Sequence, residues 1–106
     1  MSDKDWKLKL RYGQLTTPYS HYTLLADGYA EIANPDYNLE VGHCIMGLNV
    51  WATDQTEAYD VIQSVGNQLG FRITGKVELY ETDAKRPPGE NPSAYGANFT
   101  PYQIDT

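Results

Sequence analysis

Regular alternation of apolar and polar positions near the start of the chain predicts a β-strand. From Trp6 to Tyr12 every second residue is apolar, and the residues between them are lysine or arginine. A period of two residues is typical of an antiparallel strand with one buried and one solvated face. Gly13 and Pro18 then end this predicted strand.

Two more strand segments follow, at residues 21–32 and 39–51. The first is rich in residues that favour strands, but Asp27 and Gly28 lie in its middle. These two residues fit either a tight turn, which would make a short hairpin, or a bulge in one continuous strand. The sequence does not decide between them. The second segment has apolar groups on both alternating faces, so we predict a central strand that is covered on both sides for part of its length.

A helix is predicted between Asp54 and Gly70. Asp54 is well placed as the N-cap, and Glu57 follows at the spacing of a capping box. Apolar residues then recur at helical spacing and form one stripe, namely Ala58, Val61, Ile62, Val65 and Leu69. Gly70 fits the left-handed position that ends many helices, and the segment 72–82 predicts the last strand.

Together these elements predict an α+β fold in the order β-β-β-α-β. We expect an antiparallel-rich sheet of about four strands with one helix packed on one face. A strand–helix–strand crossover is right-handed, and the two strands it joins should run parallel if they share the sheet. The length of 106 residues is usual for one domain.

The composition changes after residue 82. Three prolines and one glycine lie between residues 85 and 92, and this stretch cannot sustain a helix or a sheet ladder. The residues beyond it include several aromatics, which a purely disordered tail would not be expected to carry. We therefore assign residues 1–82 to a single α+β domain. Residues 83–106 are assigned to an irregular, extended C-terminal tail that packs on the domain or is presented to a partner.

The composition also excludes several classes of protein. Cys44 is the single cysteine, so no intramolecular disulfide can form, in agreement with a reducing compartment. No apolar run reaches the roughly 18 residues that a transmembrane helix needs. The first residues also lack the apolar core of a signal peptide. We therefore expect a soluble, cytoplasmic protein with no membrane partner.

Charge is distributed unevenly along the chain. The net charge of −6 argues against direct binding of nucleic acid, which requires lysine and arginine to neutralise phosphates. No basic residue lies between Tyr12 and Phe71, and all eight basic residues lie outside that segment. The acidic residues within it are Asp27, Glu31, Asp36, Glu40, Asp54, Glu57 and Asp60. We expect one acidic side and one side of mixed charge.

Short motifs that resemble functional sites fail in their context. The stretch from Gly70 to Lys76 matches the first positions of a phosphate-binding loop, but it follows a helix and runs into a strand. Val77 also stands where that loop needs serine or threonine to bind magnesium. The oxygen ligands at 36–40 lack the central glycine and the closing glutamate of a calcium loop. We predict no metal and no cofactor.

The histidines and the cysteine do not form a recognisable catalytic set. His43 and Cys44 are adjacent on a predicted strand and therefore point to opposite faces. One cysteine and two scattered histidines do not have the spacing of a zinc site. A pair formed across strands by His21 and Cys44 remains open as an alternative. No catalytic residue is assigned, and the pattern favours a protein that is not an enzyme.

Tyrosine is the feature that points most directly to function. The chain contains nine tyrosines, and tyrosine is enriched at recognition surfaces, although it also favours strands. With the acidic segment, this predicts a non-enzymatic protein that binds a protein partner. In its sharpest form, it is an inhibitor or immunity-type protein that masks a basic surface. The predicted partner-binding residues are Asp27, Tyr29, Glu31, Asp36, Tyr37, Glu40, Tyr95 and Tyr102.

A second hypothesis belongs to a different class of function. A small domain with one sheet and one helix has little room to enclose a substrate, unless two copies enclose it between them. The chain would then be a small-ligand binder or a minor enzyme with its site at a homodimer interface. Light scattering separates this hypothesis from the first, since a monomer would have no such site.

Overall fold

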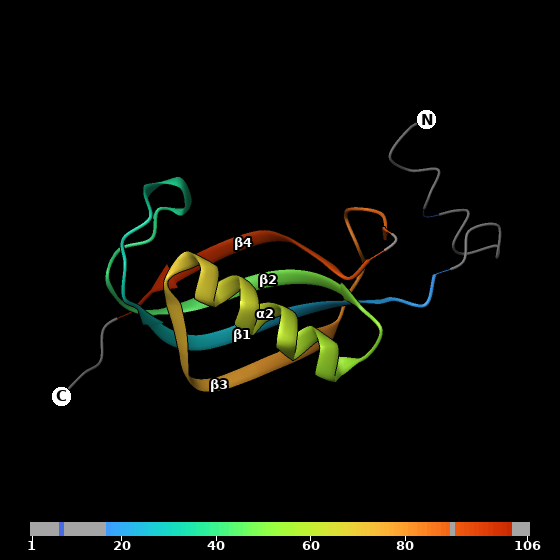
Figure 1. Ribbon diagram of the computed structural model, residues 1–106, viewed down its shortest axis with the longest axis horizontal. Helices are drawn as coiled ribbons and strands as arrows, with labels where there is room; N and C mark the ends of the chain where they lie inside the picture. The colour runs from blue at the N-terminus through green and yellow to red at the C-terminus, as the bar shows by residue number, and fades with distance from the viewer. Residues whose placement is uncertain (1–6, 8–16, 90, 103–106) are drawn as a thin grey trace.

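A computed structural model describes residues 7, 17–89 and 91–102 of the chain. The strand predicted at 6–12 lies, apart from Lys7, outside these residues. The described elements are β1 (Ser20–Ala30), the 3-10 helix η1 (Pro35–Tyr37), β2 (Gly42–Ala52), α2 (Gln55–Leu69), β3 (Phe71–Glu81) and β4 (Ser93–Pro101). The four strands form one sheet in the order β3-β1-β2-β4, and every neighbouring pair is antiparallel (Figure 1). The fold is α+β, as predicted.

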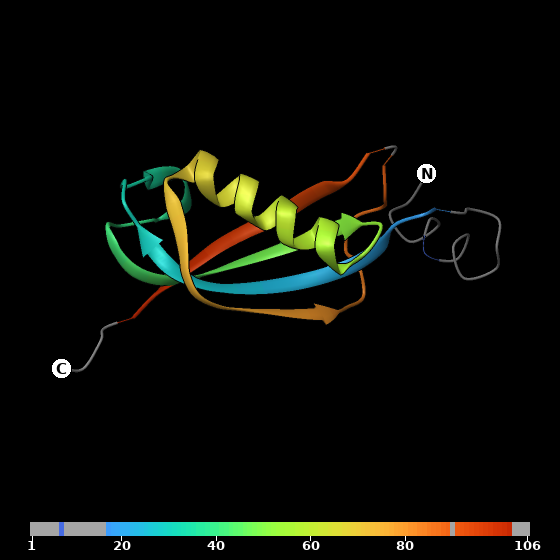
Figure 2. The ribbon, with the colours of Figure 1, turned by 60° about the horizontal axis from the view of Figure 1, so that its bottom comes forward.

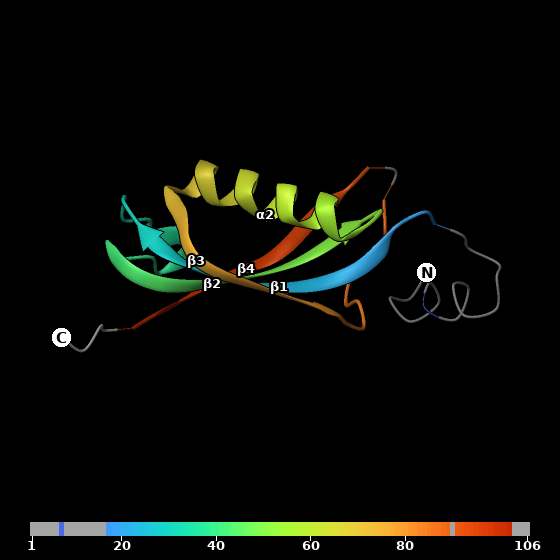
Figure 3. The same cartoon turned by 90° about the horizontal axis from the view of Figure 1, so that it is seen from below.

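The sheet and the helix form two layers. Figures 2 and 3 show α2 lying across one face of the sheet. The helix buries Ala58, Ile62 and Gly66 against this face. The largest fully buried side chains of the sheet are Phe71, Leu24, Met46, Leu48, Val50 and Cys44. Because burial of one large aliphatic side chain contributes about 2 kcal/mol, this layer supplies most of the stabilising apolar contact.

The opposite face of the sheet carries no helix among the residues that the structure describes. We call it the open face. Alternation along each strand decides which residues it contains, since neighbours in sequence point to opposite sides. The residues of the two central strands on this face are His21, Thr23, Leu25, Asp27 and Tyr29 of β1 and His43, Ile45, Gly47, Asn49 and Trp51 of β2.

The predicted helix is confirmed, including its ends. The Asp54 carboxylate accepts a hydrogen bond from the Glu57 N–H at 2.8 Å. The Glu57 carboxylate accepts from the Thr53 N–H at 2.8 Å rather than from the backbone of the N-cap residue itself. Gly70 has φ of 80° and ends the helix in the left-handed conformation that glycine adopts without strain.

Of the two interpretations of Asp27 and Gly28, the tight turn is wrong, because β1 runs without a break through both residues. The irregularity is present, but its extra residues lie on β3, where residues 74–76 stand opposite Asp27 alone. β1 is continuous, and its pairing with β3 shifts register between Ala26 and Gly28. On β3, Gly75 lies beside this irregularity, and a Cβ atom there would come within 2.6 Å of Asp27 Oδ2. The missing side chain of Gly75 therefore provides the space that the Asp27 carboxylate occupies.

The strands on either side of the helix, β2 and β3, share the sheet and run in the same direction, because both are antiparallel to β1. They are not neighbours, since β1 lies between them. β2 is central, as predicted, between β1 and β4.

The prediction of an irregular tail was wrong for residues 93–101. These residues form β4, which pairs with β2. The proline-rich stretch makes only the connection between β3 and β4. The strand itself tolerates a register shift between Gly47 and Asn49 of its partner, and Gly96 absorbs the irregularity with φ of 69°. Residues 103–106 lie outside the described part of the chain.

Candidate functional site

The open face carries one histidine–aromatic cluster at each end. β1 begins near His21 and ends near Tyr29, and β2 begins near His43 and ends near Trp51. The antiparallel register places His21 opposite Trp51 and Tyr29 opposite His43. β4 contributes Tyr95 to the first pair, and Tyr102, directly after β4, joins the second pair. We call His21, Trp51 and Tyr95 the His21 cluster, and Tyr29, His43 and Tyr102 the His43 cluster.

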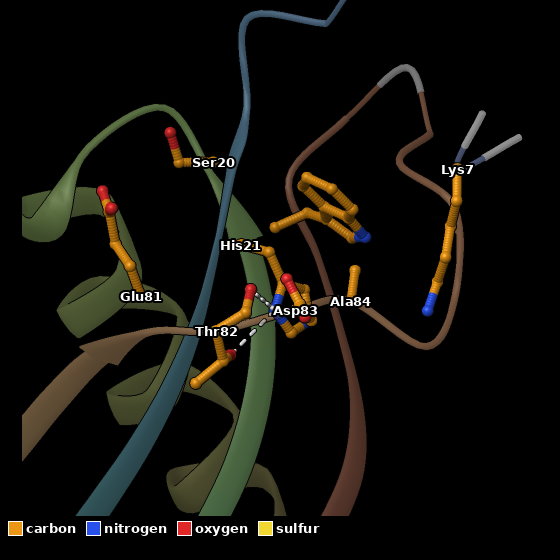
Figure 4. A pocket seen from close by; sticks show the side chains of 8 residues that line it. Lys7, Ser20, His21, Glu81, Thr82, Asp83 and Ala84 are labelled. Atoms are coloured by element: carbon orange, nitrogen blue, oxygen red, sulfur yellow. Dashed lines mark hydrogen bonds between the residues drawn. The ribbon is translucent and has the colours of Figure 1, made fainter. Parts of the chain in front are cut away.

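Both ring nitrogens of His21 are hydrogen-bonded. Nδ1 lies 3.1 Å from the Thr82 carbonyl oxygen and 3.0 Å from the Thr82 hydroxyl (Figure 4). Nε2 lies 2.7 Å from the Tyr95 hydroxyl. Because a carbonyl oxygen only accepts, Nδ1 carries the proton and Nε2 accepts from Tyr95. Burial lowers the pKa of His21, against the opposing effects of the Thr82 carbonyl and of Asp83, so the neutral ring is favoured.

The His21 cluster holds the connection between β3 and β4 against the sheet. The Tyr95 hydroxyl accepts a hydrogen bond from the Lys85 N–H at 2.9 Å. The Trp51 indole N–H donates to the Arg86 carbonyl at 2.8 Å. The Arg86 guanidinium lies 5.2 Å from the centre of the Tyr95 ring. The polar groups of this cluster therefore serve the fold.

A cavity of about 450 Å³ lies beside the His21 cluster (Figure 4). Among its lining side chains are the carboxylates of Glu81 and Asp83. It offers no free imidazole nitrogen, because both nitrogens of His21 are bonded. Throughout the described residues, no three side chains of the metal-binding types come together. The cavity thus contains no arrangement to which we assign a catalytic step.

The His43 cluster has a different chemistry. The His43 ring stands edge-on to Tyr29, with centroids 5.0 Å apart, and is tilted against Tyr102 at 5.9 Å. The Tyr102 N–H donates to the His43 carbonyl at 3.1 Å. The Tyr102 hydroxyl reaches over β2 and donates to the Asp27 carboxylate of β1. This hydrogen bond raises the pKa of Tyr102, because it stabilises the protonated phenol beside a negative charge.

Between the clusters lies a shallow depression of about 380 Å³, which we call the central depression. It is lined by Leu25, Asp27, Ile45, Lys76, Glu78 and Tyr102. Leu25 and Ile45 are 38% and 37% exposed, which is high for apolar side chains of central strands. Lys76 Nζ lies 3.3 Å from Glu78 Oε1. The central depression therefore combines an aliphatic surface with two carboxylates and one ammonium group.

The structure brings together three of the predicted partner-binding residues. Asp27, Tyr29 and Tyr102 meet at the His43 end of the open face. Tyr95 is separated from them, because it belongs to the His21 cluster at the other end.

The other predicted residues lie in or beside the connection between β1 and β2. Glu31, Asp36 and Glu40 are exposed there. Tyr37 of η1 packs edge-on against Phe99, with ring centroids 6.2 Å apart. Phe99 lies opposite Met46 and packs against the core that α2 covers, so Tyr37 lies on that side of the sheet and not on the open face.

Separation of charge in the sequence does not become separation in space. β3 pairs with β1 and brings its basic residues beside the acidic segment. Arg72 lies 2.9 Å from a Glu31 carboxylate oxygen, and Lys76 lines the central depression with Asp27. The basic residues of β3 therefore partly neutralise the acidic residues of β1 and of the connection that follows it.

The alternative pairing of His21 with Cys44 is wrong. Cys44 lies opposite Gly28 on the face that α2 covers and is 2% exposed, whereas His21 lies on the open face. Burial raises the pKa of the Cys44 thiol and keeps it protonated.

Sequence reasoning missed Leu25, Ile45 and the two clusters. One signal for the clusters was present, since histidine and an aromatic residue have the same spacing in β1 and in β2. The role of Leu25 and Ile45 depends on which face of the sheet the helix covers.

In the described part of the chain, no helix has the length and apolar character required to span a membrane. No protein-family model, curated protein or solved structure matches this chain, so the open face is the basis for assigning a function.

Proposed function

We propose that this protein is a non-enzymatic protein-binding module that docks a partner on its open face. The observation that carries the proposal is the apolar patch around the central depression. Antiparallel sheets often expose one face to water, but that face is then mainly polar. Here Leu25, Ile45 and Tyr80 are 38%, 37% and 51% exposed. Tyrosine, which is enriched at protein interfaces, stands at one end of the same face, as Tyr29 and Tyr102 of the His43 cluster.

The edges of the sheet are less suited to binding than its face. An edge strand with a free row of backbone groups invites pairing with another chain. β3 carries Lys76 beside the irregularity at Gly75, and β4 contains Gly96 in a left-handed conformation and ends with Pro101. Lysine, proline and bulges are features that discourage strand addition. A partner is therefore expected on the face.

The charge of the protein favours a basic partner. The chain has a net charge of −6, and Asp27 and Glu78 line the central depression. Glu31, Asp36 and Glu40 are exposed in the connection between β1 and β2, at the end of the sheet that carries the His43 cluster. Opposite charges accelerate association, and salt weakens the attraction between exposed charges. This supports the narrower proposal of an inhibitor or immunity-type protein that masks a basic surface.

The test is affinity capture from an extract of the source cells with three matched baits. They are the unaltered chain, Leu25→Glu on the open face and Tyr59→Glu on the outer side of α2. Leu25 and Tyr59 are 38% and 40% exposed, so the two changes are comparable in burial and differ in location. We expect one stoichiometric protein on the unaltered and Tyr59→Glu baits, its loss from Leu25→Glu, and weaker retention at high salt.

Thermal unfolding of each bait checks that all three are folded. A protein retained equally by Leu25→Glu would contradict the proposal. Sedimentation of the purified chain addresses the second hypothesis. A dimer that Leu25→Glu converts to a monomer would identify a second copy as the occupant of the open face, and the small-ligand or enzymatic alternative would then replace this proposal.

A further inference from the structure

We infer that the central depression is an anchoring site for an arginine side chain of the protein partner. This inference rests on the proposed function and specifies how the open face would recognise a basic surface. It follows from the shape of the depression, from its charge, and from the way the Asp27 carboxylate is held.

The size and lining of the depression suit one long side chain. Its volume of about 380 Å³ is near the lower end of the roughly 300–1,000 Å³ typical of small-molecule pockets. Leu25 and Ile45 stand on neighbouring strands and provide aliphatic surface between the charged groups. A side chain with an apolar stem and a charged end can bury the stem on such a surface while the end stays at the rim.

The Asp27 carboxylate is held in one orientation, and no ion pair neutralises it in the described part of the chain. Its Oδ1 accepts the hydrogen bond from the Tyr102 hydroxyl. Its Oδ2 lies over Gly75, where a Cβ atom would approach to 2.6 Å. Within the residues that the structure describes, Asp27 forms no ion pair, whereas Glu78 is paired with Lys76 at 3.3 Å. A carboxylate has about four acceptor positions, so Asp27 keeps capacity for a charged donor.

Arginine matches these features better than other side chains. A wholly apolar side chain would remove water from Asp27 without pairing its charge, which is unfavourable. Lysine is a compact and strongly hydrated charge, whereas the guanidinium group is less hydrated and offers several donors in a planar fork. The guanidinium group also stacks on aromatic rings, and Tyr102 lines the depression beside Asp27.

The test is an NMR titration of the full chain with two small probes. N-acetyl-arginine amide carries the proposed group, and N-acetyl-citrulline amide has almost the same shape without the charge. We expect saturable shifts of the Leu25 and Ile45 methyl signals with the arginine probe. Because hydrogen bonds between charged groups contribute about 1.5 kcal/mol or more, the citrulline probe should bind at least roughly tenfold more weakly than the arginine probe.

Variants localise the interaction. Asp27→Asn keeps the shape of the side chain and should weaken binding of the arginine probe severalfold. Asp60→Asn changes an exposed acidic residue of α2 and should leave it unchanged. Tyr102→Phe removes the hydroxyl that orients Asp27 and should have an effect between these two. One-dimensional spectra confirm that each variant is folded.

Three results would overturn the inference. They are equal binding of the two probes, equal weakening by Asp27→Asn and Asp60→Asn, and the absence of methyl shifts at Leu25 and Ile45 at saturating probe. If these occur while Leu25→Glu still abolishes capture of the partner, the open face binds protein without an arginine anchor. If Leu25→Glu retains the partner, the proposed function itself is wrong.

Discussion

The two ends of the open face contain similar residues and differ in what those residues do. The His21 cluster and the His43 cluster each combine a histidine, an aromatic residue from the neighbouring strand and a tyrosine from β4 or the residue directly after it. His21 is 7% exposed, and both of its ring nitrogens are bonded. In the His43 cluster, the Tyr102 hydroxyl instead donates a hydrogen bond to Asp27 at the rim of the central depression.

The difference arises from the connection between β3 and β4. This connection lies against the His21 end, where Trp51 donates a hydrogen bond to its Arg86 carbonyl and Tyr95 accepts one from its Lys85 N–H. The His43 end has only Tyr102 across it in the described residues, and its polar atoms border a depression that is open to solvent. Similar side chains therefore support the fold where the connection covers them and border a solvent-exposed depression where it does not.

Removal of the aromatic residue opposite each histidine should separate the clusters most strongly. Trp51 is 5% exposed, and replacement of a buried tryptophan by alanine lowers the free energy of unfolding by about 3–5 kcal/mol. Tyr29 is only partly buried, so Tyr29→Ala should lower it by about 1 kcal/mol. Urea denaturation of both variants measures the difference. A larger loss for Tyr29→Ala would contradict the assignment of the His21 cluster as scaffold.

The two tyrosine hydroxyls provide a second and smaller contrast. Tyr95→Phe leaves His21 Nε2 and the Lys85 N–H without their partner, which should lower the free energy of unfolding by about 1–3 kcal/mol. Tyr102→Phe should change stability less, because the Asp27 carboxylate at the rim can be solvated instead. Chemical denaturation again provides the measurement. Equal losses would show that the two clusters have the same structural role.

The pH dependence of stability should report the burial of His21, and this is the smallest of the three expected effects. The pKa of His21 is lowered in the folded state from the unfolded value of 6.5, so below that pH the unfolded chain binds more protons. This contribution to stability is complete above 6.5 and is lost as the pH falls through the folded pKa.

His21→Gln should therefore reduce the loss of stability between about pH 7 and pH 5 relative to the unaltered chain. Thermal unfolding of the variant and of the unaltered chain across this pH range measures the difference. The same loss in both would contradict the lowered pKa of His21.

The elements that sequence predicted well are those stabilised by near neighbours in the chain. The N-cap Asp54, the stripe that contains Ala58 and Ile62, and the end at Gly70 all lie where they were predicted. Each depends on backbone and side-chain groups within a few residues, so the local sequence specifies it.

The elements that sequence left open or predicted wrongly depend on a partner strand. Whether Asp27 lies in a turn or in a continuous strand depends on its partner strands, and on β3 Gly75 leaves space for its carboxylate. β4 was missed because the prolines before it suggested an irregular tail, whereas its pairing with β2 makes it a strand. Neither pairing can be derived from local propensity, since it brings together residues far apart in the chain.

The same distinction applies to the candidate site. The sequence alone establishes the alternation of side chains in β1 and β2, the acidic charge and the abundance of tyrosine. Only the tertiary structure places α2 over one face, exposes Leu25 and Ile45 on the other, and brings Tyr102 to Asp27. Alternation separates two faces, but the packing of one helix against the sheet decides which of them is buried and which remains available for binding.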